Sequence, residues 1–162
     1  MAARLTPGAG AANVATGLPV LDHLLGRLAA SGGFDLALEL PPGDAEAEVD
    51  EAGRAVGEAA APLLRADGAP RHGAALLPAD EALAQVALEV SDRPLVASNV
   101  DLTAARAGGL GSDLAARFLD AFARSAGLTL HVRLLEGEDS HHVLEAIFQA
   151  LGAALAQASH RA

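Results

Sequence analysis

The chain has 162 residues, a net charge of −10 and no cysteine, which excludes disulfide bonds, thiolate metal sites and cysteine nucleophiles. The strong negative charge argues against nucleic acid as the main partner. No apolar run reaches membrane length and no secretory signal opens the chain, so we expect no membrane partner and a cytoplasmic protein. The length fits one domain, and its core must be built mainly of Ala, Leu and Val because only 2% of the residues are aromatic.

The first half of the chain predicts a helix, a strand and a second helix after an irregular start. Residues 1–15 are rich in Gly and Ala, and we expect them to be irregular. A helix begins near Thr16, the candidate N-cap, and ends at Gly32-Gly33. From Phe34 to Leu40, apolar residues alternate with Asp, Ala and Glu, which predicts a half-buried strand. An Ala-rich helix then runs to about Arg65.

The second half predicts several strands and two helices, and it begins at the turn-like segment Asp67–Pro70. Three predicted strands cover residues 74–78, 82–90 and 95–100, although residues 81–89 also have helical propensity. A helix is expected near residues 112–125, with Phe118 and Phe122 facing inward. Residues 128–134 then alternate in the manner of a second clear strand.

The residues best suited to metal chemistry lie at the start of the last predicted helix, which Asp139 or Ser140 can cap. On a helix, His141 and Glu145 are one turn apart on the same side, and His142 also lies near Glu145. Two imidazoles around one carboxylate suit two metal ions, or one ion and a substrate. The positive end of the helix favours neutral imidazole, the form that binds metal. The alternative is a pair of solvated histidines on a first helical turn.

The order of predicted elements recurs along the chain. When the helix that contains His23 is laid over the helix that contains Arg117, the glycines and the alternating strands that follow coincide without a gap. We therefore expect a single domain over residues 1–162, made of two repeated halves at about 13–67 and 68–160. Chance matching of two helix–glycine–strand units is the alternative.

Five segments of the chain resemble signatures of the imidazoleglycerol-phosphate dehydratase family of histidine biosynthesis. They are Thr16–Leu25 (TGLPVLDHLL), Ser31–Leu36 (SGGFDL), residues 80–94 (DEALAQVALEVSDRP), Gly127–Arg133 (GLTLHVR) and Asp139–Ala146 (DSHHVLEA). Their order and spacing agree with the family from about residue 13 to residue 158.

The resemblance implies an α+β fold of two similar halves of sheet plus helices, like the second domain of ribosomal protein S5, here shortened at its N- and C-termini. It implies a metal-dependent carbon–oxygen lyase that eliminates water from a small phosphorylated imidazole, imidazoleglycerol phosphate. It also implies a large homo-oligomer with a pair of manganese ions at subunit boundaries. Metal-bound imidazole can delocalise the charge that develops when a neighbouring C–H is deprotonated, which lowers the barrier.

The resemblance assigns roles to individual residues of this chain. His23, His141, His142 and Glu145 match family metal ligands, and Glu145 is also a candidate catalytic base; Arg71 and Arg93 match arginines that bind the substrate phosphate. Arginine suits phosphate because its planar guanidinium offers two parallel donors.

Half of the family's metal ligands are replaced in this chain. The first-half ligand motif falls within Glu46–Glu51, where both histidines are missing and only Asp50 or Glu51 can replace its glutamate. A further ligand histidine is Arg117 here, and a family lysine after the second motif is Gln149. Two functions therefore stay open: a dehydratase of histidine biosynthesis, or a non-catalytic paralogue that acts as an oligomeric or small-ligand-binding protein.

Arg117 brings a permanent positive charge to a position where the family has a neutral metal ligand. We expect it to pair with Glu145, Asp50 or Glu51, and so to neutralise a carboxylate that a metal ion would otherwise hold. The hypothesis that follows is a protein with little or no tightly bound manganese and no measurable dehydratase activity.

Overall fold

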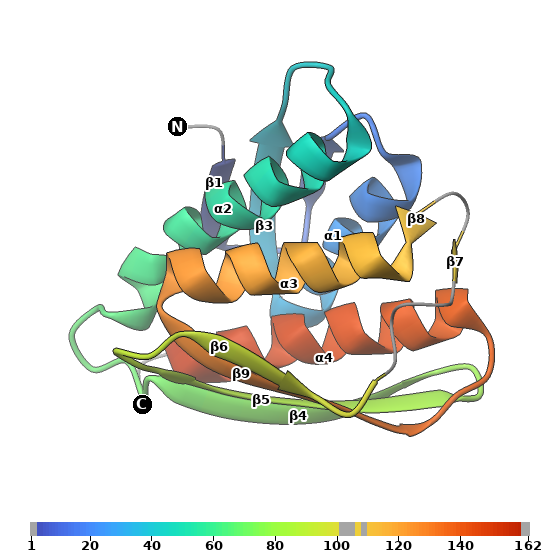
Figure 1. Ribbon diagram of the computed structural model, residues 1–162. Helices are drawn as coiled ribbons and strands as arrows, with labels where there is room; N and C mark the ends of the chain where they lie inside the picture. The colour runs from blue at the N-terminus through green and yellow to red at the C-terminus, as the bar shows by residue number, and fades with distance from the viewer. Residues whose placement is uncertain (1–2, 101–105, 108–109, 160–162) are drawn as a thin grey trace.

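The computed structural model describes residues 3–100, 106–107 and 110–159 of the chain, shown as a ribbon in Figure 1. Within these residues the chain has an α+β fold with four helices and two mixed sheets, as well as a short two-stranded pair. Two helices lie against each sheet, and the two helical layers face one another in the middle of the molecule (Figure 1). None of the helices in the described part is both long and apolar enough to cross a membrane.

The N-terminal sheet has the strand order β1-β3-β2, formed by β1 (Ala3–Pro7), β2 (Ala12–Ala15) and β3 (Phe34–Glu39). Strand β1 pairs with β3 in the antiparallel sense, and β2 pairs with β3 in the parallel sense. The prediction of a strand from Phe34 is confirmed.

The prediction that residues 1–15 are irregular is wrong for the part that the structure describes. Buried Ala3 and Leu5 alternate with exposed Arg4 and Thr6, which is the two-residue period of a strand with one face on the core. The alternation is short, and the high Gly and Ala content of the segment favoured an irregular structure in the sequence-based prediction.

Helix α1 (Pro19–Gly32) has proline in its first turn and stops at Gly33, whose φ of +67° is the left-handed conformation that glycine adopts freely. Thr16 does not cap this helix, contrary to expectation. Its hydroxyl instead donates to the Oδ1 of Asp22, in the first turn of α1, at 2.6 Å. This hydrogen bond holds the segment that leads into the helix.

Helices α2 (Ala45–Leu64) and α3 (Ser112–Ala126) pack against each other at very short range. A Cβ at Gly53 would lie only 2.7 Å from the carbonyl oxygen of Phe118, and a Cβ at Gly57 would lie 2.7 Å from the carbonyl oxygen of Phe122. Glycine at both positions lets the backbones approach, and this brings side chains at the N-terminal ends of the two helices within reach of each other.

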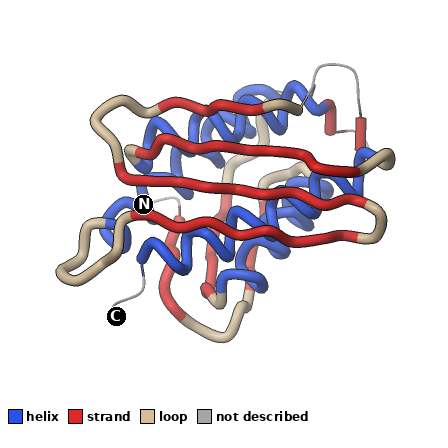
Figure 2. The backbone as a smooth tube through the Cα atoms, turned by 90° about the horizontal axis from the view of Figure 1, so that it is seen from below, coloured by secondary structure: helices blue, strands red, loops and turns tan. Residues whose placement is uncertain are grey.

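The second sheet has the order β4-β5-β9-β6. Its strands are β4 (His72–Ala79), β5 (Ala82–Val90), β6 (Leu95–Ser98) and β9 (Leu128–Glu136), and the short pair is β7 (Arg106–Ala107) with β8 (Leu110–Gly111). The strands predicted from the sequence in this half are confirmed. Figure 2 shows the four strands lying across one side of the molecule with the helices behind them.

Helix α4 (Ser140–Ser159) packs on β4 and β5 and runs alongside α1. As predicted, Asp139 caps it, because its Oδ1 accepts hydrogen bonds from the first backbone N–H groups of the helix. A Cβ at Gly152 would lie 2.1 Å from the carbonyl oxygen of Leu28, so α1 and α4 also meet at glycine. The buried rings of Phe148 and Phe118, 5.4 Å apart, join α4 to α3 at the centre of the core.

Candidate functional site

The contact between α1 and α4 brings two predicted metal ligands together. His23 Nε2 lies 3.2 Å from Glu145 Oε2. Arg27, one turn after His23, places its Nη2 2.8 Å from the same oxygen, and its Nη1 donates to Gln149 Oε1 at 2.9 Å. The Glu145 side chain is only 14% exposed, so a carboxylate in this position needs polar partners, and protein side chains supply them.

His142 points away from this cluster and lies between two carboxylates of the β4–β5 turn. Its Nδ1 is hydrogen-bonded to Glu81 Oε1, and its Nε2 lies 3.2 Å from Asp80 Oδ2. The second oxygen of Glu81 accepts the backbone N–H groups of Glu138 and Asp139, each at 3.0 Å. Glu81 therefore fixes the entry to α4 and the orientation of the imidazole together.

These contacts shift the pKa values of both side chains. The backbone N–H groups of Glu138 and Asp139, with the hydrogen bond from His142, lower the pKa of Glu81 to about 2. The hydrogen bond to Glu81 raises the pKa of His142 above its ordinary value. The sequence led us to expect a neutral imidazole because of the helix N-terminus, whereas the surrounding carboxylates raise the pKa of His142 and so act in the opposite direction.

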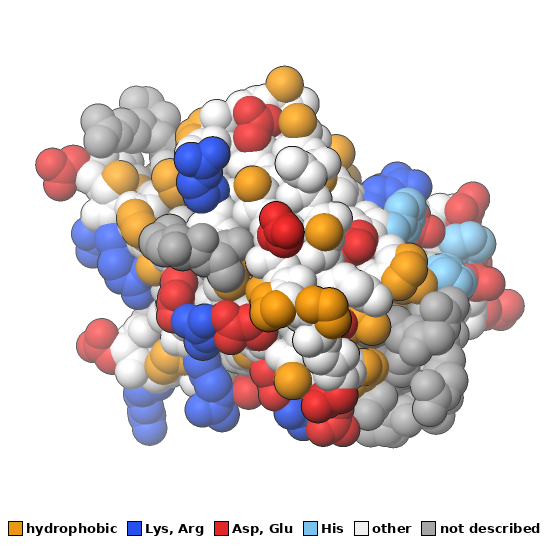
Figure 3. Space-filling model, turned by 90° about the horizontal axis from the view of Figure 1, so that it is seen from above, with side chains coloured by type: hydrophobic (Ala, Val, Ile, Leu, Met, Phe, Trp, Pro, Cys, Tyr) orange, Lys and Arg blue, Asp and Glu red, His pale blue; other side chains and the backbone are white. Residues whose placement is uncertain are grey.

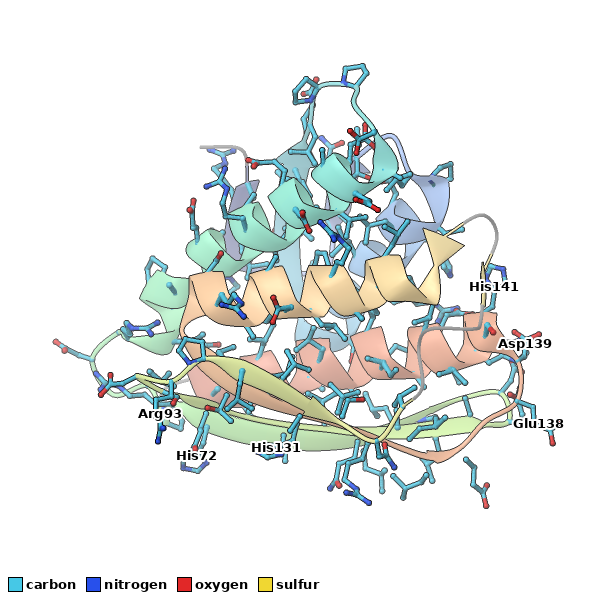
Figure 4. All side chains as sticks on the ribbon, in the orientation of Figure 1. His72, Arg93, His131, Glu138, Asp139 and His141 are labelled. Atoms are coloured by element: carbon cyan, nitrogen blue, oxygen red, sulfur yellow. The ribbon has the colours of Figure 1, made fainter. Side chains whose placement is uncertain are left out.

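His141 occupies the first turn of α4 with an exposed side chain. Figure 4 places it beside Asp139 at the end of the helix. In Figure 3, histidine side chains gather at one edge of the face shown, next to arginine and among acidic side chains. Three of the predicted ligands, His23, His141 and Glu145, thus lie at the same end of the α1–α4 pair, whereas the His142 ring is turned toward the β4–β5 turn.

The contact between α2 and α3 holds the corresponding feature of the other half. Arg117 Nη2 lies 2.5 Å from Asp50 Oδ2. Glu51 instead pairs with Arg54 on its own helix, and Glu48 is buried, where it accepts the backbone N–H of a preceding glycine. The expectation that Arg117 pairs with a nearby carboxylate is confirmed, and Asp50 is the carboxylate that faces it.

The two contacts occupy comparable places. In one, His23 near the start of α1 faces Glu145 near the start of α4; in the other, Arg117 near the start of α3 faces Asp50 near the start of α2. His23 and Arg117 are the positions that coincide when the two halves of the sequence are superimposed. Arg117 therefore forms an ion pair at the position equivalent to His23, although the same superposition places Glu145 on Glu51, the neighbour of Asp50.

The predicted phosphate-binding residues lie at the far end of the second sheet. The carbonyl oxygen of Arg71 accepts the N–H of Val90, the last residue of β5, and Arg93 follows three residues later. Glu81, which contacts His142, is the residue before the first residue of β5. Because β5 has nine residues, its two ends are about 26 Å apart. Figure 4 shows Arg93 and His141 at opposite ends of the molecule.

The residues present do not fit the pair of manganese ions that the resemblance implies. In the part of the chain that the structure describes, no group of three or more His, Asp or Glu side chains is arranged to hold a metal ion. Glu145 is held by Arg27, and Asp50 by Arg117. A neighbouring copy of the same chain cannot add the missing histidines, because it lacks them too.

Arg27 was not predicted as part of the site, and Glu81 was not distinguished from an ordinary turn residue. The spacing could have found Arg27, because it is four residues after His23 and therefore on the same face of α1. Gln149 is likewise four residues after Glu145 and therefore on the same face of α4. Only the folded chain brings Glu81 to His142, because 61 residues separate them in sequence.

Comparison with known proteins gives a consistent result. A family model described as imidazoleglycerol-phosphate dehydratase matches residues 16–155. A protein of that name from Syntrophobacter fumaroxidans is 42% identical over 163 residues, covering 98% of this chain and 83% of the relative. One from Moorella thermoacetica is 42% identical, covering 93% of this chain and 79% of the relative.

Solved structures match along the same length. The crystal structure of imidazoleglycerol-phosphate dehydratase from Staphylococcus aureus superimposes with a TM-score of 0.88 at 28% identity, covering 98% of this chain and 92% of that one. The structure from Pyrococcus furiosus gives a TM-score of 0.86 at 29% identity, covering 99% of this chain and 88% of that one. Both the helices and the two sheets therefore have counterparts in proteins of known structure.

Proposed function

We propose that this chain, which belongs to the imidazoleglycerol-phosphate dehydratase family, is a cytoplasmic homo-oligomer that binds a phosphorylated imidazole without eliminating water from it. As a family member it is a homologue of a histidine-biosynthesis enzyme. Its framework follows the family, and the departures that bear on function are the replaced metal-ligand positions. The proposal therefore separates ligand binding, which the framework can support, from catalysis.

The Arg117–Asp50 ion pair carries the proposal. It joins the position of a family metal-binding histidine to Asp50, one of the two residues that can replace the family's metal-binding glutamate, with Nη2 and Oδ2 2.5 Å apart. A metal ion at Asp50 would have to displace a guanidinium and then lie beside it, against the repulsion of two positive charges. Glu145, contacted on one oxygen by His23 and Arg27, would in this account anchor α1 to α4 rather than act as a base.

The homo-oligomer is proposed because of where the candidate ligand-binding residues lie. Arg93 and His141 are at opposite ends of a sheet whose central strand is about 26 Å long, so one small phosphorylated imidazole cannot touch both in a single chain. A site that uses both requires the arginines of one copy to approach the histidines of another. Light scattering should then give a mass above that of one chain.

The experiment that tests the proposal combines a binding and an activity measurement. Calorimetry with imidazoleglycerol phosphate should detect binding to the parent chain, with at least tenfold weaker binding to Arg93→Ala and unchanged binding to Arg4→Ala, a control that removes an exposed arginine from β1 in the other sheet. The dehydration assay, with manganese added, should give no turnover. Turnover above the no-protein rate would contradict the non-catalytic part, and the absence of any binding would contradict the ligand-binding part.

The second candidate function is dehydration by a reduced site. It is favoured by the 3.2 Å approach of His23 to Glu145, with His141 exposed on the same end of α4. These are the ligand types that the family uses, and 42% identity to a dehydratase over nearly the whole chain supports a shared activity. If turnover is found, Glu145→Gln should abolish it, whereas Glu58→Gln, which removes an exposed carboxylate paired with Arg54, should not.

A further inference from the structure

Each of the two close helix pairs is joined near its N-terminal end by an arginine and a carboxylate. Arg27 of α1 places its Nη2 2.8 Å from Glu145 Oε2 of α4, and Arg117 of α3 places its Nη2 2.5 Å from Asp50 Oδ2 of α2. We infer that these two guanidinium groups take the structural place of two metal cations, so that both helix pairs are held together without a divalent ion.

The two carboxylates differ in how much they need a positive partner. Gly152 lets α4 approach the backbone of α1, and Gly53 lets α2 approach the backbone of α3. At the α1–α4 contact the Glu145 side chain is only 14% exposed, whereas the Asp50 side chain at the α2–α3 contact is 47% exposed. A sheltered carboxylate without a positive or hydrogen-bonding partner would destabilise the pair of helices.

Arginine meets this need differently from a metal ion. Arg27 uses one nitrogen for Glu145 and another for Gln149, so one side chain contacts α4 at two successive turns. Its charge is permanent, because the guanidinium does not lose its proton in proteins. A divalent ion on Glu145 Oε2 would lie next to Arg27 Nη2, and repulsion between the two cations would weaken its binding.

The inference concerns stability and cation dependence, and it goes beyond the proposed lack of catalysis. An active dehydratase would overturn the proposed function, but the thermal unfolding of the arginine variants would still decide whether the guanidinium groups join the helices. Conversely, an inactive protein that manganese stabilises would overturn the inference and leave the proposed function standing.

Thermal unfolding of the full chain, in EDTA and in manganese chloride, tests the inference. The parent should have the same melting temperature in both. Arg27→Gln should lower it by about 2–4 °C in EDTA, because it breaks a contact between two helices at a largely buried carboxylate. Arg117→Gln should lower it by about 1–3 °C, because its pair with Asp50 is more exposed. The matched control is Arg124→Gln, which removes an arginine paired with Asp120 one turn away on the same helix, and it should lower the melting temperature by about 1 °C or less.

Manganese should restore part of the melting temperature lost by Arg27→Gln, because Glu145 and His23 then face a position without a guanidinium. The inference is overturned if manganese raises the melting temperature of the parent as much as that of Arg27→Gln. It is also overturned if both glutamine variants lose no more than Arg124→Gln. If Arg27→Gln fails to fold, Arg27→Lys, which keeps the positive charge, should fold and have the same melting temperature in EDTA and in manganese chloride. A lysine variant that needs manganese to fold would contradict the inference.

Discussion

Arg117 and Asp50 form an ion pair between α3 and α2, with Nη2 of the arginine 2.5 Å from Oδ2 of the aspartate. Both side chains are a little under half exposed, so the pair contributes modestly to stability on its own, about 0–1 kcal/mol. Its consequence for chemistry is larger. Asp50 already has a cation beside it, and because that cation is a side chain of the same protein it cannot be released to solution.

Because α2 and α3 pack closely, one methyl group added at their interface should destabilise the fold. Gly57→Ala places a Cβ 2.7 Å from the carbonyl oxygen of Phe122, so α2 and α3 must separate or shift. We expect a loss of about 1–3 kcal/mol in the free energy of unfolding, measured by denaturant titration. Ala59→Gly, a substitution on the same helix without such a clash, controls for the change in helix propensity. A Gly57→Ala variant as stable as the parent would show that the interface is looser than the structure has it.

The Glu81–His142 contact predicts a specific pH dependence. Folding lowers the pKa of Glu81 from 4.5 to about 2, so its carboxylate stabilises the fold above pH 4.5, and this contribution disappears as the pH falls toward 2. Folding raises the pKa of His142, so its contribution is complete below pH 6.5 and disappears as the pH rises through the raised value.

Glu81→Gln tests both halves of this dependence. The melting temperature of the variant should fall less steeply than that of the parent between pH 4.5 and pH 2, because the titrating carboxylate is gone. In NMR titrations of the ring, the pKa of His142 should be lower in Glu81→Gln than in the parent. An unchanged His142 pKa would mean that Glu81 does not hold the imidazole in solution.

Much of the fold follows from local patterns in the sequence, whereas the site does not. The strands from Phe34 and Leu128 are confirmed because two-residue alternation over six or more residues has few other readings. Strand β1 was missed because only Ala3 and Leu5 carry its inward face. The division into halves at residues 13–67 and 68–160 stays a prediction, although helix, strand and helix follow in the same order as α1-β3-α2 and α3-β9-α4.

The site depended on contacts between distant segments. Asp50 and Glu51 are neighbours on α2, and their sequence alone does not say which one faces Arg117. Which of the two faces Arg117 depends on how α2 is rotated about its axis relative to α3. Gly53 and Gly57 determine this rotation, because they are the residues of α2 that lie against the backbone of α3. The charge of His142 likewise depends on the β4–β5 turn, and the helix-terminus argument omitted the carboxylates that this turn brings.

Arg71 offers a test that separates backbone strain from ligand binding. Its φ of +70° is a left-handed conformation that costs an L-residue with a Cβ roughly 1 kcal/mol. Arg71→Gly should therefore be more stable to denaturant than Arg71→Ala by about that amount. Both variants should bind imidazoleglycerol phosphate at least tenfold more weakly than the parent, because both lose the guanidinium. Unimpaired binding in both would remove Arg71 from the ligand site.

The central claim is that arginines have replaced metal in this chain, and metal content tests it most directly. The full-length protein should be incubated with manganese, passed through gel filtration in buffer with a low, known manganese concentration, and analysed for manganese per subunit. The account predicts far less than one ion per subunit, because Arg27 and Arg117 hold the carboxylates that a metal would need. Retention of close to two ions per subunit would contradict it and would restore the metal-dependent dehydratase as the better description of this protein.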